Sequence, residues 1–159
     1  MKHSPPDRVL ECLVLPAGQV DLLLPEVCVV EVLRYQPLAR AAGPRGCIGL
    51  LGWREGDVPV VDVGLLGAVA AQAVTQGRAI AILQRTIADS LWPFWAVALS
   101  GLPRKRRVEA SAVALVGAES SGCPGSWVRA GASQCLIPDL ASLQREQLPP
   151  VTWTQPGSL

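Results

Sequence analysis

The segment of residues 49–63 constrains the fold of this chain most, because it has the pattern of a β-hairpin. Its flanks, residues 47–53 and 58–63, are apolar, as strands that pack on a core are. The four residues between them, Arg-Glu-Gly-Asp, suit a tight turn in which Gly56 supplies a positive φ. Arg54 stands at the lip of this turn, where an arginine is better placed to contact a partner than to fill a core.

Short apolar runs separated by turn residues continue along the chain and predict further strands. They occupy residues 9–15, 20–24, 79–84, 94–99, parts of 107–116, 128–132 and 134–137. Residues 26–33 have the pattern of a helical turn that leads into a strand. Helical spacing is confined to residues 65–73 and 139–148, and Asp139 is expected to cap the second of these helices.

Many short strands, frequent turns and one or two short helices predict a mostly β domain. At 159 residues, two small barrels packed together are favoured over one large barrel. Half of the residues are hydrophobic but aromatic residues make up only 4%, so we expect a core of Val, Leu, Ile and Ala. The folded domain is expected to span residues 8–148, between tails at 1–7 and 149–159 that are expected to be disordered.

The chain shows no pattern of membrane insertion or secretion. No apolar run approaches the roughly 18 residues that a membrane span needs. Residues 1–6 lack the apolar region of a secretory signal. We therefore expect a cytoplasmic protein with no direct membrane insertion.

The charges argue against nucleic acid as the main partner. The formal net charge is +1, whereas nucleic-acid-binding domains carry a basic excess. The one basic cluster, residues 104–107, is best explained as a solvated strand edge or turn, where charges deter edge-to-edge pairing with another strand. A phosphate site, or a contact with an acidic protein partner, is the alternative use of this cluster.

Catalytic and metal-binding groups are sparse. The single histidine, His3, lies in an expected tail, and Cys and His do not cluster as a zinc site requires. Carboxylates near the hairpin are better explained as solvating the turn (Glu55, Asp57) and ending a strand (Asp62) than as an acid–base pair. The sequence thus predicts no catalytic residue, no metal site and no cofactor. The cysteines form no CxxC pair and are expected to be buried or semi-buried reduced thiols: Cys12, Cys28, Cys47, Cys123 and Cys135.

Three aromatic residues fall within positions 92–95. If these residues alternate along a strand, Trp92 and Phe94 share one side and Trp95 faces the other. At least one ring is then partly exposed, and exposed aromatic rings mark protein interfaces more often than cofactor sites.

Three segments of the chain resemble the CheW-like domain family, the adaptor module of bacterial chemosensory systems. Residues 23–32 are similar to the family segment "lP…V.EV", and residues 46–62 to its hairpin "G.iNlRG…PV.DL". Residues 134–140 look like its final strand-to-helix step. The order and spacing of these segments support the resemblance, which as a whole spans about residues 8–148.

The resemblance implies two small SH3-like five-stranded β-barrel subdomains that share a core, with short helices and no catalytic activity. Family members link the cytoplasmic tips of methyl-accepting chemoreceptors to the regulatory domain of a CheA-type histidine kinase. Arg54 matches the family's hairpin arginine, which is implicated in receptor coupling, and Gly49 matches the glycine that opens the hairpin. Val29 and Glu31 match a segment on the receptor-facing side. A separate apolar strand surface of the first barrel would bind the kinase.

The chain also departs from the family pattern. Gly52 stands where the family usually has Asn, and Glu55 where it has Gly, so that a carboxylate is placed to pair with Arg54 and weaken its reach. The Trp53–Arg54 pair and residues 101–104 look more like the divergent adaptors of type IV pilus systems, which implies control of twitching motility.

Two other classes of function stay open at this point. One is a stand-alone CheW-fold module with a partner other than a chemoreceptor. The other is a small carboxylate-dependent hydrolase or a ligand-binding barrel. Of these two, the hydrolase would need a deep polar pocket.

Overall fold

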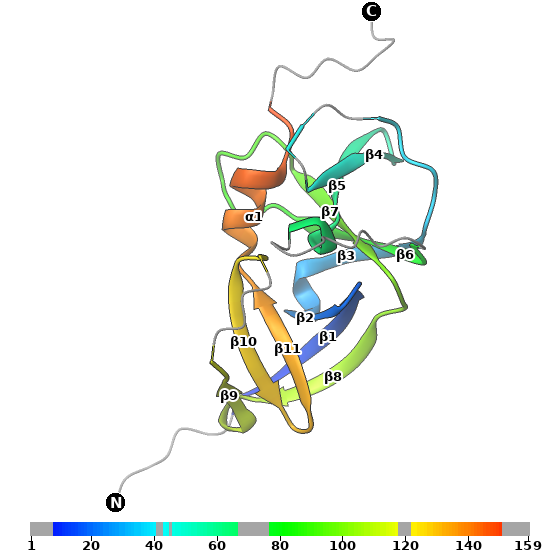
Figure 1. The fold of residues 1–159 in the computed structure, drawn as a ribbon. Coiled ribbons are helices and arrows are strands. Elements are labelled where there is room, and N and C mark those ends of the chain that lie inside the picture. The colour runs from blue at the N-terminus through cyan, green and yellow to red at the C-terminus, as the bar shows by residue number, and fades with distance from the viewer. Residues whose placement is uncertain (1–7, 41–42, 45, 67–76, 118–121, 151–159) are drawn as a thin grey trace, which may run out of the picture.

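The computed structural model describes residues 8–40, 43–44, 46–66, 77–117 and 122–150, which form two β-sheets and one α-helix (Figure 1). The first sheet has six strands in the order β8-β1-β2-β11-β10-β9 and the second has five in the order β3-β6-β7-β5-β4. The strands of the first sheet are β1 (Val9–Ala17), β2 (Val20–Pro25), β8 (Arg104–Glu109), β9 (Val113–Leu115), β10 (Gly125–Ala130) and β11 (Ser133–Pro138). Those of the second are β3 (Val29–Arg34), β4 (Cys47–Trp53), β5 (Gly56–Val61), β6 (Ala79–Gln84) and β7 (Phe94–Leu99).

Short helical segments connect or end the strands. They are the 3₁₀ turns η1 (Glu26–Cys28), η2 (Val63–Leu66) and η3 (Ala110–Ala112), and the helix α1 (Leu140–Gln147). The prediction of a mostly β, two-part fold is therefore confirmed, although the first sheet carries six strands. The expected helix over residues 65–73 begins as the 3₁₀ turn η2, and the remainder of that prediction lies outside the described residues. No helix in the described parts of the chain is long and apolar enough to span a membrane.

The first sheet pairs strands from the early and the late parts of the chain. β1 pairs antiparallel with both β2 and β8, and β10 and β11 form the predicted hairpin. β11 then meets β2 in parallel, with Leu136 opposite Leu22. In the second sheet, β4 and β5 form the hairpin predicted from residues 49–63, and β5 pairs in parallel with β7.

A shared core lies between the sheets and explains why they form one unit. Successive side chains of a strand point to opposite faces, and both faces of β6 are buried. Ala81 and Leu83 enter the shared core, while Ile80 and Ile82 enter a second cluster inside the five-stranded barrel. A third cluster, which includes Cys12, lies on the far face of the six-stranded sheet.

The helix α1 ties the two sheets together. Its predicted cap is confirmed, because the Asp139 carboxylate accepts hydrogen bonds from the backbone N–H and the hydroxyl of Ser142, and these bonds lower the pKa of that carboxyl. Leu143 is fully buried in the shared core. The amide oxygen of Gln144 accepts a hydrogen bond from the backbone N–H of Thr86, and that of Gln147 accepts one from Gly46.

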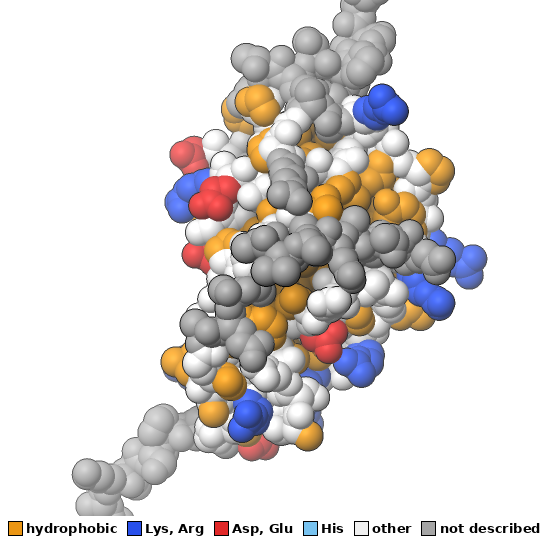
Figure 2. Space-filling model, viewed as in Figure 1, with side chains coloured by type: hydrophobic (Ala, Val, Ile, Leu, Met, Phe, Trp, Pro, Cys, Tyr) orange, Lys and Arg blue, Asp and Glu red, His pale blue; other side chains and the backbone are white. Residues whose placement is uncertain are grey.

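The basic run of residues 104–107 forms β8, an outer strand of the six-stranded sheet, as predicted. Three of its cations face carboxylates at 2.9–3.7 Å: Arg107 with Glu11, Lys105 with Glu26 and Arg104 with Asp21. The fourth, Arg106, donates a hydrogen bond to the carbonyl of Ala130. Three of the four cations are therefore paired with carboxylates, whereas the hydrogen bond of Arg106 to a carbonyl leaves its charge uncompensated. Figure 2 shows the charged side chains of one face dispersed among apolar ones.

We expect Leu143→Ala to lower the free energy of unfolding by about 2–5 kcal/mol, because it leaves a cavity in the core that both sheets share. Urea unfolding followed by circular dichroism measures the change. The matched control is Leu115→Ala on the outer strand β9, where the leucine is 80% exposed and the change should stay within about 0.5 kcal/mol. Equal effects of the two substitutions would contradict the role assigned to Leu143.

Candidate protein-interaction site

The tip of the β4–β5 hairpin is a two-residue loop. The register pairs Trp53 with Gly56, so that only Arg54 and Glu55 lie between the strands. Arg54 has a φ of +53°, in the left-handed region that residues other than glycine rarely adopt. The expectation that Gly56 supplies the positive φ is therefore wrong: Gly56 already belongs to β5, and the sharp turn falls on the first loop residue.

The Arg54 side chain lies over an aromatic ring. Its guanidinium carbon is 4.1 Å from the centroid of the Trp53 ring, which is within range of a cation–π interaction. Trp53 in turn meets Phe94 edge-on, with 5.0 Å between ring centroids. Both the charge and the orientation of Arg54 are thus supported by a ring that is itself packed against the barrel core.

Glu31 holds the other side of that ring. The indole Nε1–H of Trp53 donates a hydrogen bond to Glu31 Oε2 at 2.8 Å. Glu31 belongs to β3 and Trp53 to β4, the two outer strands of the five-stranded sheet, so this bond links the sheet's opposite edges. Glu31 and Arg54 are exposed, and both contact Trp53, Arg54 over the face of the ring and Glu31 at the indole N–H on its edge. We call Glu31, Trp53, Arg54 and Phe94 the hairpin cluster.

The structure does not bring Val29 and Gly49 into the hairpin cluster. The register of β3 and β6 shifts between Val29 and Glu31, and Val29 packs against the shared core. Gly49 is buried and pairs with Val60, away from the tip. A Cβ on Gly49 would lie 2.6 Å from the carbonyl oxygen of Ala39, so that a glycine is required for this close backbone approach. Gly49 therefore acts on the packing of the hairpin, whereas Val29 acts on the shared core.

Two members of the hairpin cluster were not identified as site residues from the sequence: Trp53 and Phe94. The aromatic segment at positions 92–95 was the available signal. Phe94 and Trp95 face opposite cores as predicted, but Trp92 packs on the same core as Trp95, because β7 begins at Phe94 and the alternation does not extend back to residue 92. A cavity of about 270 Å³ lies beside the cluster, lined by Arg54, Asp57, Pro93 and Phe94 among others.

Glu55 does not neutralise the arginine beside it. The ion pairs found in the described parts of the chain all involve β8, and none joins Glu55 to Arg54. The guanidinium lies on Trp53 instead. The N–H groups of a guanidinium lie in its own plane and point outward from its edge, so a contact of its face with a ring leaves them able to bind a carboxylate or a carbonyl of a partner.

The structure offers little reactive chemistry elsewhere. None of the five cysteines forms a disulfide, and burial raises the pKa of the Cys123 thiol to about 11, which makes it a poor nucleophile near neutral pH. In the described ranges, no group of three or more His, Cys, Asp or Glu is placed to hold a metal ion. His3 lies outside those ranges.

Comparisons with known proteins identify the fold. No family model matches the sequence, and no curated protein matches it either. Among solved structures, the chain is similar to the crystal structure of the scaffolding protein TtCheW from Thermoanaerobacter tengcongensis, with a TM-score of 0.67 and 14% sequence identity. The match covers 90% of this chain and 91% of that one, so the CheW-like fold extends over nearly the whole of both.

Alanine variants are usually more stable than glycine variants at the same position, and the positive φ of Arg54 should reverse this order. We expect Arg54→Gly to be more stable than Arg54→Ala by about 1 kcal/mol, because both lose the contact with Trp53 but only glycine relieves the left-handed backbone. Thermal and urea unfolding measure the difference.

The neighbouring position provides the control. Glu55 has no positive φ, so Glu55→Gly should be less stable than Glu55→Ala by roughly 0.5–1 kcal/mol. The same ranking at both positions would show that Arg54 does not hold this conformation in solution.

Proposed function

We propose that this chain is a non-catalytic adaptor of a bacterial chemosensory pathway, acting in the cytoplasm. It would couple the cytoplasmic tip of a methyl-accepting chemoreceptor to the regulatory domain of a CheA-type histidine kinase. The observation that carries this proposal is an exposed arginine, held on a packed tryptophan at the tip of the hairpin, in a CheW-like fold whose solved neighbour is described as a scaffolding protein.

The geometry of the hairpin cluster suits a protein contact. Arginine and tryptophan are over-represented among the residues that dominate binding energy in protein interfaces. Arg54 is exposed, whereas Trp53 is only 8% exposed, so the arginine is held in place before a partner arrives. Less rotamer entropy is then lost on binding, because the side chain is already ordered.

We assign Arg54 and Glu31 to the receptor-coupling face. Glu31 contributes in two ways: it accepts the indole hydrogen bond that orients Trp53, and its carboxylate stays exposed beside the site. We also propose that Gly49 and Val29 act on this face indirectly, Gly49 through the close approach of β4 to Ala39 and Val29 through its contact with the shared core.

The kinase would dock on a separate, apolar strand surface of the first barrel. Leu115 on the outer strand β9 is 80% exposed, which gives that barrel an apolar contact away from the hairpin cluster. Two faces on different barrels would allow the adaptor to hold a receptor and a kinase at once.

A second candidate is a stand-alone module of the same fold with a partner other than a chemoreceptor. The departures at Gly52 and Glu55 favour it, because they change the surface around Arg54. A place in a type IV pilus system that controls twitching motility would fit this divergence and the Trp53–Arg54 pair. A small carboxylate-dependent hydrolase would need a deep polar pocket, whereas the cavity that Glu55 and Asp57 line is small, at about 270 Å³, and shares its lining with Trp53, Val58 and Phe94.

The decisive test is binding of Arg54→Ala to the chemoreceptor and kinase encoded by neighbouring genes. Truncating a central interface arginine often costs about 2 kcal/mol or more, so receptor affinity should fall roughly 30-fold. Co-sedimentation with receptor-containing vesicles measures the receptor arm, and calorimetry with the isolated kinase regulatory domain measures the other.

Matched variants separate the two faces. Arg129→Ala removes an exposed arginine of β10 in the other barrel and should leave receptor binding unchanged. Leu115→Arg should weaken the kinase arm and spare the receptor arm. If Arg54→Ala leaves receptor binding unchanged, the site assignment is wrong; if the unaltered chain binds neither protein, the adaptor function itself is wrong.

A further inference from the structure

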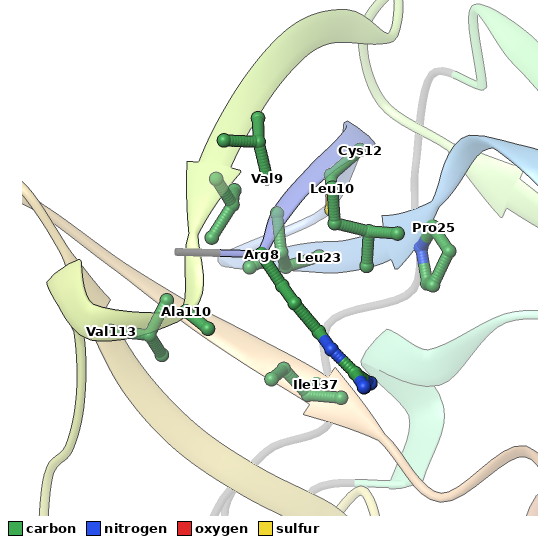
Figure 3. Close-up of a pocket in the computed structure, with 10 residues that line it drawn as sticks. Arg8, Val9, Leu10, Cys12, Leu23, Pro25, Ala110, Val113 and Ile137 are labelled. Atoms are coloured by element: carbon green, nitrogen blue, oxygen red, sulfur yellow. The ribbon is translucent and has the colours of Figure 1, made fainter. Parts of the chain in front are cut away.

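A second surface, on the six-stranded barrel, has the form of a ligand pocket. A cavity of about 600 Å³ opens where β1 runs on past the end of its partner β2. This volume lies within the range of small-molecule sites in proteins. Its lining comes from β1, β2, β8, η3, β9 and β11 (Figure 3), so the cavity depends on how several elements of the six-stranded sheet pack together rather than on a single loop.

The walls of this cavity are aliphatic. Cys12 and Leu23, which are buried, belong to the cluster on this side of the sheet, while Val113 and Ile137 come from β9 and β11. Leu10 is 50% exposed at the cavity, although a side chain of this size and type is usually buried. Burial raises the pKa of the Cys12 thiol, so the thiol stays uncharged at neutral pH.

One cation belongs to this apolar lining. Among the described residues that line the cavity, Arg8 is the only charged one. Figure 3 shows its side chain extending from the start of β1 toward Ile137. The Arg8 carbonyl accepts a hydrogen bond from the backbone N–H of Ala110 at 3.0 Å, which fixes the start of this side chain. None of the ion pairs in the described ranges involves Arg8.

We propose that this cavity binds a free aliphatic carboxylate, with the acyl chain among the apolar side chains and the carboxylate on the Arg8 guanidinium. A pocket with one cation and apolar walls matches a ligand that is polar at one end only. A peptide fits less well, because each of its residues brings an amide donor and an acceptor, and burying these without partners is costly. The proposal does not depend on the adaptor function.

The test is a titration of the full chain with octanoate, decanoate and dodecanoate, each below its critical micelle concentration. Calorimetry and amide NMR monitor the titration. We expect saturable binding, affinity that rises with chain length, and shifts confined to residues around the cavity. Decanol, which has the same chain without the charge, should bind about tenfold more weakly than decanoate, since a charge-assisted hydrogen bond is lost.

Three variants decide the assignment. Arg8→Gln should weaken decanoate binding about tenfold and leave decanol binding unchanged. Ala110→Phe, at an exposed lining position, should block both ligands by filling the cavity. Arg129→Gln is the matched control and should change neither.

Several outcomes would overturn the proposal. Arg8→Gln and the unaltered chain would bind decanoate with equal affinity, or Ala110→Phe would still bind decanoate and decanol. Amide NMR shifts spread over the whole surface would also contradict it. Binding of anionic phospholipid vesicles without binding of free decanoate would assign the surface to a membrane instead, and saturable binding only of an acidic peptide would assign it to a protein.

Discussion

The shared core between the two sheets is the constraint on which the rest of the structure depends. β6 and β7 are buried on both faces, so their alternate side chains serve two cores at once. The small side chains of Ala81 and Ala96 keep the layers close, while Trp95 and Leu143 fill the space between the sheets. Because each sheet completes the other's core, the hairpin at the far edge is carried on a rigid base.

That base lets the hairpin tip hold an unfavourable backbone. A left-handed arginine persists only where its surroundings over-determine it. Here the surroundings are a two-residue loop, the stack on Trp53 and the bond from Trp53 to Glu31 across the sheet's edges. Strain of this kind is common where a side chain must be presented in one orientation, and it fits the proposal that Arg54 meets a partner.

The two barrels expose chemically different surfaces. The five-stranded barrel presents a charged side chain supported by aromatic rings, whereas the six-stranded barrel opens into an aliphatic cavity beside a single arginine. In the basic strand β8, three of the four cations are paired with the carboxylates of Asp21, Glu26 and Glu11. The two proposals of function therefore concern separate groups and can be tested with separate substitutions.

The sequence by itself determined the features that depend on neighbouring residues. These are the strand pattern, the hairpin of residues 49–63, the Asp139 cap and the charged outer strand, all of which follow from side-chain alternation or local hydrogen bonding. Only the tertiary structure decided how distant segments meet. The two outer strands of the sheet bring Glu31 to Trp53, Val29 packs against the shared core instead of joining them, and the close approach of Ala39 explains Gly49. Such contacts arise from the packing of strands far apart in the chain, and local patterns carry no record of them.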